Sequence, residues 1–173
     1  MVYFWIEILV YFWGEINTFD VRFLKTNSGK KGEGMPVVRN PQFYFREGFT
    51  WIFTLNESAE YLKARIKTAS VNDVNAMSLF PFDDFSVPSY YFVCLLNSYF
   101  IFKYKREFIN STSAFQINDA RQLPIIIPTS FQIKTFQNIF EKALELKGQP
   151  EKANELHDLE IILDIQVSEI YGI

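Results

Sequence analysis

The sequence contains few of the residues on which catalytic and metal sites most often depend. Its 173 residues include one cysteine, Cys94, and one histidine, His157. These counts exclude an intramolecular disulfide, a multi-cysteine metal site and a multi-histidine metal centre. Cys94 lies in an apolar run and is expected to pack as a small hydrophobe, and His157 lies in an acidic stretch and is expected at the surface. An enzyme is therefore the function that the residues support least.

The chain also lacks a long apolar run. Its first 13 residues are hydrophobic, but they are too short to span a bilayer, contain Glu7, and lack the basic start and cleavage site of a signal peptide. Their aromatic and β-branched content predicts a strand over residues 2–12, with a weaker strand over residues 19–24. We expect no membrane partner and a cytoplasmic location. An abrupt hydrophobic opening is typical of a chain that begins inside a larger architecture.

Charge of one sign does not dominate the chain, whose formal net charge is −3. Residues 36–130 carry nine Lys/Arg and eight Asp/Glu, whereas residues 131–173 carry four and eight. The acidity thus belongs to the C-terminal segment. A near-neutral middle segment can still present a basic face, so net charge neither establishes nor excludes DNA binding.

Apolar residues make up 49% of the chain and aromatic residues 18%, which is ample material for one packed domain. Alternating apolar and polar positions over residues 36–54 predict strands on both sides of Gly48. The glycine- and lysine-containing segment 26–34 predicts a loop, either in contact with phosphate or simply solvated.

Residues 61–70 alternate basic and apolar side chains. A strand here would place Lys63, Arg65 and Lys67 on one face and Leu62, Ala64 and Ile66 on the other. Such a basic strip suits a phosphate backbone. The alternative is an exposed edge strand whose lysines prevent aggregation.

A helix is predicted from Pro88 to Phe108, because apolar residues recur there at helical spacing. The predicted core positions are Phe92, Leu95, Leu96, Tyr99 and either Phe102 or Lys103. At its end Lys103, Lys105 and Arg106 complement the helix dipole and can also reach DNA.

Residues 111–128 contain an ordered series of short elements. Asp119 or Asn118 can cap a one-turn helix, which Pro124 ends. Three isoleucines, residues 125–127, then predict a short buried strand. Beyond it, residues 130–146 and 151–171 predict two helices that form a hairpin, because Gly148 stops the first and Pro150 helps to start the second. Leu156, Leu159, Leu163 and Ile170 form the apolar stripe of the second helix.

Four motifs, in this order, resemble elements of restriction-modification target recognition domains. Residues 44–51, Y-F-R-E-G-F-T-W, resemble the F-R-E-G-I-T-W signature of type IIG enzymes and of the methyltransferases of BREX phage defence. Residues 95–98, L-L-N-S, resemble a helix that packs across the sheet of those domains. Residues 116–128 resemble the Q-x-x-D-[IL]-x-x-L-P element, which type I specificity subunits also contain. The ending V-S-E-I-Y-G-I resembles the V-x-x-L-Y-G-[IL] ending of the same enzymes.

This resemblance implies a DNA-recognition module of an adenine-N6 methyltransferase system, without a catalytic part of its own. The segment N-P-Q-F at residues 40–43 lacks the second proline of the N-P-P-[YF] methyltransferase motif, and no glycine-rich cofactor loop precedes it. S-adenosylmethionine is therefore expected only in a separate methyltransferase domain, and no cofactor or metal is expected in this chain. The expected partners are double-stranded DNA, the methyltransferase and, where one is attached, a nuclease subunit.

The implied fold is α+β, a small mixed or antiparallel sheet packed by a long helix and followed by a C-terminal helical hairpin. The expected divisions are an N-terminal segment (1–35), a recognition domain (36–130) and the hairpin (131–173). The candidate DNA contacts are the cations of the matched region: Arg39, Arg46, Lys63, Arg65, Lys67, Lys103 and Arg106. Arg46 can equally form a scaffold ion pair with its neighbour Glu47. The alternative function is an assembly module that docks restriction-modification subunits and has little DNA affinity.

Overall fold

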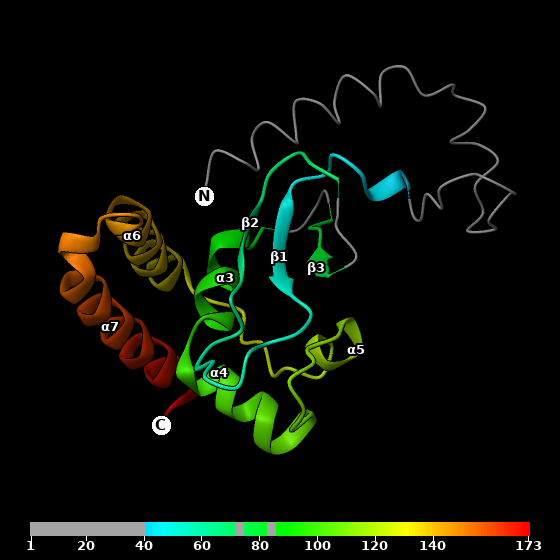
Figure 1. Ribbon diagram of the computed structural model, residues 1–173. Coiled ribbons are helices and arrows are strands. Elements are labelled where there is room, and N and C mark those ends of the chain that lie inside the picture. Colours follow the sequence, from blue (N-terminus) through cyan, green and yellow to red (C-terminus); the bar gives the residue numbers. More distant parts are fainter. Residues whose placement is uncertain (1–40, 72–74, 83–85) are drawn as a thin grey trace, which may run out of the picture. The chain divides into compact units, whose positions relative to one another are not determined.

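The computed structural model describes residues 41–71, 75–82 and 86–173 (Figure 1). The described residues fall into two compact parts, and the larger, here called the main unit, comprises residues 47–68, 75–82 and 86–173. Residues 41–46 and 69–71 belong to the other part. The predicted strands over residues 2–12 and 19–24 and the predicted loop over 26–34 lie outside the described residues. The predicted domain boundaries stay a prediction.

The main unit contains a three-stranded antiparallel sheet, in the order β2-β1-β3. The middle strand β1 (Gly48–Ile52) pairs with β2 (Arg65–Lys67) on one side and with β3 (Ala76–Leu79) on the other. Gly48 is required where β1 lies beside the end of β3, because an added Cβ would lie 2.2 Å from the carbonyl oxygen of Leu79. With the helices described below, this sheet confirms the predicted α+β class.

Over residues 41–47 the prediction of a strand before Gly48 is wrong, and residues 36–40 lie outside the described residues. Residues 41–43 form a 3-10 helix, η1 (Pro41–Phe43), and residues 44–47 form no strand. Phe45 adopts a positive φ of 60°. A left-handed residue interrupts extended pairing, so the aromatic alternation that predicted a strand here does not produce one.

The predicted helix over residues 88–108 is divided into three segments: α3 (Ser89–Leu96), α4 (Tyr99–Tyr104) and η2 (Lys105–Ile109), a π-helical turn. The break lies at Asn97 and Ser98. The Asn97 side chain accepts a hydrogen bond from the backbone N–H of Ala64 at 2.8 Å and donates one to the Ala64 carbonyl at 2.9 Å. Ser98, in extended conformation, accepts from the N–H of Ile101 and caps α4. Tyr99 is consequently 52% exposed instead of lying in the predicted core stripe.

The one-turn helix is present as α5 (Ile117–Ala120). Asp119 accepts a hydrogen bond from the N–H of Gln116, as a capping carboxylate does. The prediction of a buried strand over residues 125–127 is wrong, because these residues belong to no strand and Ile127 is 77% exposed. The segment is instead held by tyrosine hydroxyls: Tyr91 donates to the carbonyl of Ile126, and Tyr171 donates to that of Pro124.

The C-terminal hairpin is present, with α6 (Ser130–Leu146) and α7 (Ala153–Tyr171) joined through a 3-10 turn, η3 (Pro150–Lys152) (Figure 1). Thr129 and Gln132 form a reciprocal capping box at the start of α6. Gly148 adopts a φ of 80° after the end of α6, as predicted for a helix stop. The predicted stripe of α7 faces inward: Leu163 is buried, and Leu156, Leu159 and Ile170 are half-buried.

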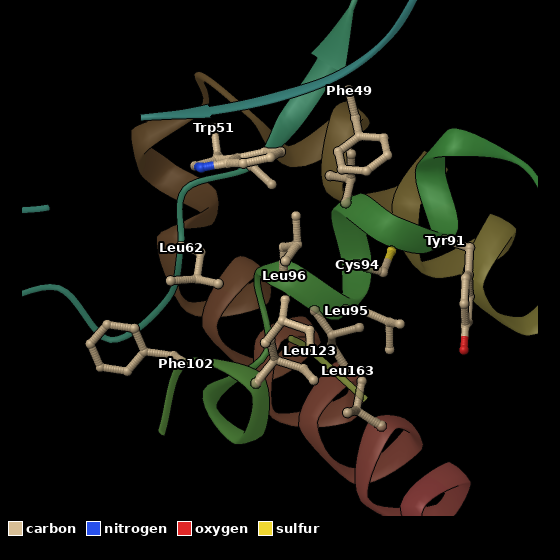
Figure 2. Close-up of a cluster of buried hydrophobic side chains, with 14 of the residues drawn as sticks. Phe49, Trp51, Leu62, Tyr91, Cys94, Leu95, Leu96, Phe102, Leu123 and Leu163 are labelled. Atoms are coloured by element: carbon tan, nitrogen blue, oxygen red, sulfur yellow. The ribbon is translucent and has the colours of Figure 1, made fainter. Parts of the chain in front are cut away.

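The hydrophobic core joins the sheet to the helices (Figure 2). Phe49 stacks on Phe92 of α3 with ring centroids 5.2 Å apart. Cys94 is 4% exposed, which confirms its predicted packing, and burial raises the pKa of its thiol to about 12. His157 has an exposed side chain, as predicted. Within the described ranges, no helix has the length and apolar character needed to cross a bilayer.

Strongly alkaline solution is expected to destabilise the main unit through Tyr171. Burial raises the pKa of its phenol to about 12, above the value of 10.0 in the unfolded chain. The unfolded state therefore loses the proton first, and stability that is complete below pH 10 is lost as the pH rises towards 12. Urea denaturation from pH 8 to 11.5 checks this. Tyr171→Phe should be about 1 kcal/mol less stable at pH 8 but lose less stability on alkalinisation, and an unchanged pH dependence would contradict the assignment.

Candidate nucleic-acid interface

The predicted basic strip does not form. β2 covers only Arg65–Lys67, and Lys63 precedes it with a positive φ of 52°. Leu62 and Ala64 are buried as predicted, but the alternation then shifts, so that Ile66 is exposed and Lys67 is only 4% exposed. The Lys67 ammonium donates to the carbonyl of Thr68 and lies 5.4 Å from the ring centroid of Phe80.

Burial lowers the pKa of the Lys67 ammonium, against the opposing effect of Glu47. A side chain in this position is poorly placed to follow a phosphate backbone. Arg65 remains exposed on β2. Arg46 is exposed in the other part of the chain, with its guanidinium 5.9 Å from the ring centroid of Phe43, and Arg39 lies outside the described residues.

Three of the predicted cations are brought to one region of the main unit. Arg106 is exposed on η2, and its guanidinium lies 5.7 Å from the ring centroid of Phe102. Lys103, on α4, pairs with Glu107 at 3.8 Å. Lys63 reaches the same region through Asn56: the Lys63 ammonium donates a hydrogen bond to the side-chain oxygen of Asn56 at 3.2 Å.

A hollow of about 430 Å³, here called the Arg106 hollow, lies between the segments 55–57 and 111–113. Its lining includes the buried residues Leu55, Phe102 and Lys105. The polar side chains that line it are Asn56, Glu57, Arg106, Ser111, Thr112 and Ser113. A second hollow of about 270 Å³ shares Phe102, Arg106 and Ser111 with the first and adds Tyr99, Lys103 and Glu107. Arg106 thus lies at the junction of both.

Lys105 is fully buried beside the Arg106 hollow. Its ammonium donates to the carbonyl of Thr112. Burial lowers the pKa of this ammonium, Asp119 raises it, and Arg106 adds a smaller lowering effect. The π-helical turn η2 directs Lys105 inward and the next residue, Arg106, outward. Turns of this kind frequently occur at functional sites.

The hydroxyl residues 111–113 are the part of this site that sequence reasoning missed. The run N-S-T-S at residues 110–113 is rich in side chains that hydrogen-bond to nearby backbone, which is the one signal for a structured turn. Its proximity to Asn56 depends on long-range pairing: Leu55 N–H donates to Ser113 O, and Phe115 N–H donates to Phe53 O.

The described residues contain no group of three or more His, Cys, Asp or Glu side chains that could hold a metal ion. A cationic hollow with hydroxyl and amide groups has the chemistry of an anion site, since such side chains supply most protein contacts to phosphate oxygens. No protein-family model matches the chain, and no curated protein is similar enough to it to count as a match.

Proposed function

We propose that this chain is the DNA-recognition module of a restriction-modification system of the adenine-N6 methyltransferase type. It would bind duplex DNA and position it for a methyltransferase domain. The observation that carries the proposal is the grouping of Lys63, Lys103 and Arg106 around hydroxyl-lined hollows. The motif resemblance supplies the biological setting.

Arginine and lysine have different expected roles in this site. Arginine presents a planar fork that can bind a phosphate or the O6 and N7 acceptors of guanine, whereas lysine acts as a point charge. Phosphate contacts would fix the register of the duplex, and base contacts would read sequence. Arg65 stays a candidate because it is exposed, whereas Lys67 is the weakest of the described candidates because it is buried. S-adenosylmethionine would belong to the methyltransferase domain.

Duplex DNA of random sequence is expected to bind with an affinity that falls steeply between about 50 and 200 mM salt. In the triple variant Lys63→Ala, Lys103→Ala and Arg106→Ala, affinity should depend less steeply on salt. The magnitude of the slope of log affinity against log salt should fall by about 2 to 3, because each lost phosphate contact accounts for about 0.9. Fluorescence anisotropy measures both quantities. The matched control, Lys134→Ala, Lys142→Ala and Arg121→Ala, removes the same charge from exposed positions elsewhere and should keep the wild-type slope. Equal slopes for the two triple variants would contradict the assignment.

A second candidate function is the docking of restriction-modification subunits. The observation that favours it is an apolar outer face on α7, where Ile161, Ile162 and Ile165 are each about half exposed. The opposite face of α7 includes Leu163 and Val167, which are buried in the core, so α7 is part of the main unit. Wild-type protein that fails to bind DNA at 50 mM salt would favour this docking function over DNA recognition.

A further inference from the structure

The turn that lines the Arg106 hollow is fixed by a hydrogen-bond network. The side-chain oxygen of Asn110 accepts from the N–H and the hydroxyl of Thr112, at 3.0 and 2.7 Å. The side-chain nitrogen of Asn110 donates to Asp119 at 3.1 Å, and the same carboxylate oxygen of Asp119 accepts from the N–H of Gln116 at 2.8 Å. Residues 110–116 are therefore organised before any ligand binds.

Lys105 anchors this turn from the protein interior. Its ammonium donates to the carbonyl of Thr112, and its own carbonyl accepts from the N–H of Asn110 at 2.8 Å. These bonds, together with the Asn110 network, leave two hydroxyls available. Among the described residues, the side chains of Ser111 and Ser113 have no hydrogen-bond partner, and both are exposed.

Arg106 supplies the accessible positive charge. Its position over the ring of Phe102 restricts the guanidinium without using its N–H donors. Within the described part of the chain no carboxylate forms an ion pair with it, whereas Lys103 is paired with Glu107. Glu57 is the one carboxylate among the described residues that line the Arg106 hollow, and Lys105 and Arg106 together outnumber it.

We propose that the Arg106 hollow is a binding site for a single phosphate group, held by the Arg106 guanidinium and the hydroxyls of Ser111 and Ser113. This inference extends the proposed function, because the phosphate would be one of the DNA backbone. The same donors would also bind a free phosphate. A charged fork and two neutral hydroxyl donors match the several oxygens that a phosphate presents.

Titration with inorganic phosphate, at constant ionic strength with chloride as the reference, tests the site independently of DNA. We expect saturable changes in the NMR signals of the Arg106 side chain and of the Ser111–Ser113 amides. Arg106→Gln should weaken phosphate binding at least tenfold, and Arg106→Lys should weaken it less, because lysine keeps the charge but loses the fork. Ser111→Ala with Ser113→Ala should also weaken it. Arg121→Gln, an exposed arginine on another segment, is the matched control and should bind phosphate as the wild type does.

Non-saturable changes, or equal binding by wild type and Arg106→Gln, would overturn the site. A parallel titration with random-sequence duplex DNA separates the two proposals. If phosphate competes with DNA and Arg106→Gln weakens both, the ligand is a backbone phosphate and both proposals stand. If phosphate binds but DNA does not, the site stands for a free phosphate and the proposed function fails. If DNA binds but its affinity is unaffected by Arg106→Gln and by added phosphate, the proposed function stands, and the assignment of the Arg106 hollow to a backbone phosphate fails.

Discussion

Replacing Trp51 with alanine is expected to lower the free energy of unfolding of this protein by about 3 to 5 kcal/mol, the cost typical of truncating a large buried aromatic side chain. Trp51 is 1% exposed in the middle strand β1. Its ring lies 5.2 Å from that of Phe115 and 6.1 Å from that of Phe49. The truncation would leave a cavity between the sheet and the segment that leads into α5.

A second variant separates the hydrogen bond of Trp51 from its packing. The indole N–H donates to the carbonyl of Phe115 at 2.9 Å. Trp51→Phe keeps an aromatic ring but leaves this carbonyl without its donor, so a smaller loss of about 1 to 3 kcal/mol is expected. Urea denaturation followed by circular dichroism measures both variants.

Phe131→Ala is the control for loss of an aromatic ring, because Phe131 is 79% exposed on α6. It should change the free energy of unfolding by no more than about 0.5 kcal/mol. A loss in Trp51→Ala as small as that in Phe131→Ala would contradict the position of Trp51 in the core.

Asn97→Ala is expected to lower the free energy of unfolding by about 2 to 4 kcal/mol. The Asn97 side chain acts as a substitute strand partner that satisfies both backbone groups of Ala64, a residue 8% exposed. Truncation leaves a buried N–H and a buried C=O unpaired, and each such group costs about 1 to 3 kcal/mol. Asn138→Ala, at an exposed position of α6, is the matched control and should be nearly neutral.

Asn97→Asp tests the same contact through its pH dependence. The ionised carboxylate can accept from the N–H of Ala64, but it repels the Ala64 carbonyl, so it is disfavoured in the folded state. The neutral carboxyl can both donate and accept. Its folded-state pKa should therefore exceed the unfolded value of about 3.9. The folded state then binds more protons, so the stability of the variant relative to wild type should recover as the pH falls from 7 towards 4. If the free energy of unfolding of the variant differs from that of the wild type by a constant amount from pH 7 to about 4, the paired geometry of residue 97 and Ala64 is contradicted.

Local sequence was sufficient for the elements whose signals lie within a few residues. The capping box of Thr129 and Gln132 and the left-handed Gly148 delimit α6, and both involve neighbouring residues. The apolar stripe of α7 and the short helix α5 were predicted for the same reason. The alternation after Gly48 likewise predicted β1.

Two of the failures involve partners far apart in the chain. Helix propensity favoured one helix over residues 88–108, but Asn97 and Ala64, 33 residues apart, form hydrogen bonds that end α3. Residues 125–127 have the apolar character of a buried strand, yet no strand pairs with them, and tyrosine hydroxyls from α3 and α7 hold their segment instead. The alternation at residues 61–70 wrongly placed Lys67 on the exposed face with Arg65, because periodicity cannot show where a short strand begins.

The sequence by itself determined the α+β class, the helical hairpin and the set of cations that are available to a ligand. Only the tertiary structure decided which cations act together. Pairing of residues 53–55 with residues 113–115 brings Asn56, and with it Lys63, to the turn beside Arg106, while burial removes Lys67 and Lys105 from the surface. The physical reason is that helix and turn signals are local, whereas a binding surface depends on contacts between distant segments and on which side chains those contacts leave exposed to water.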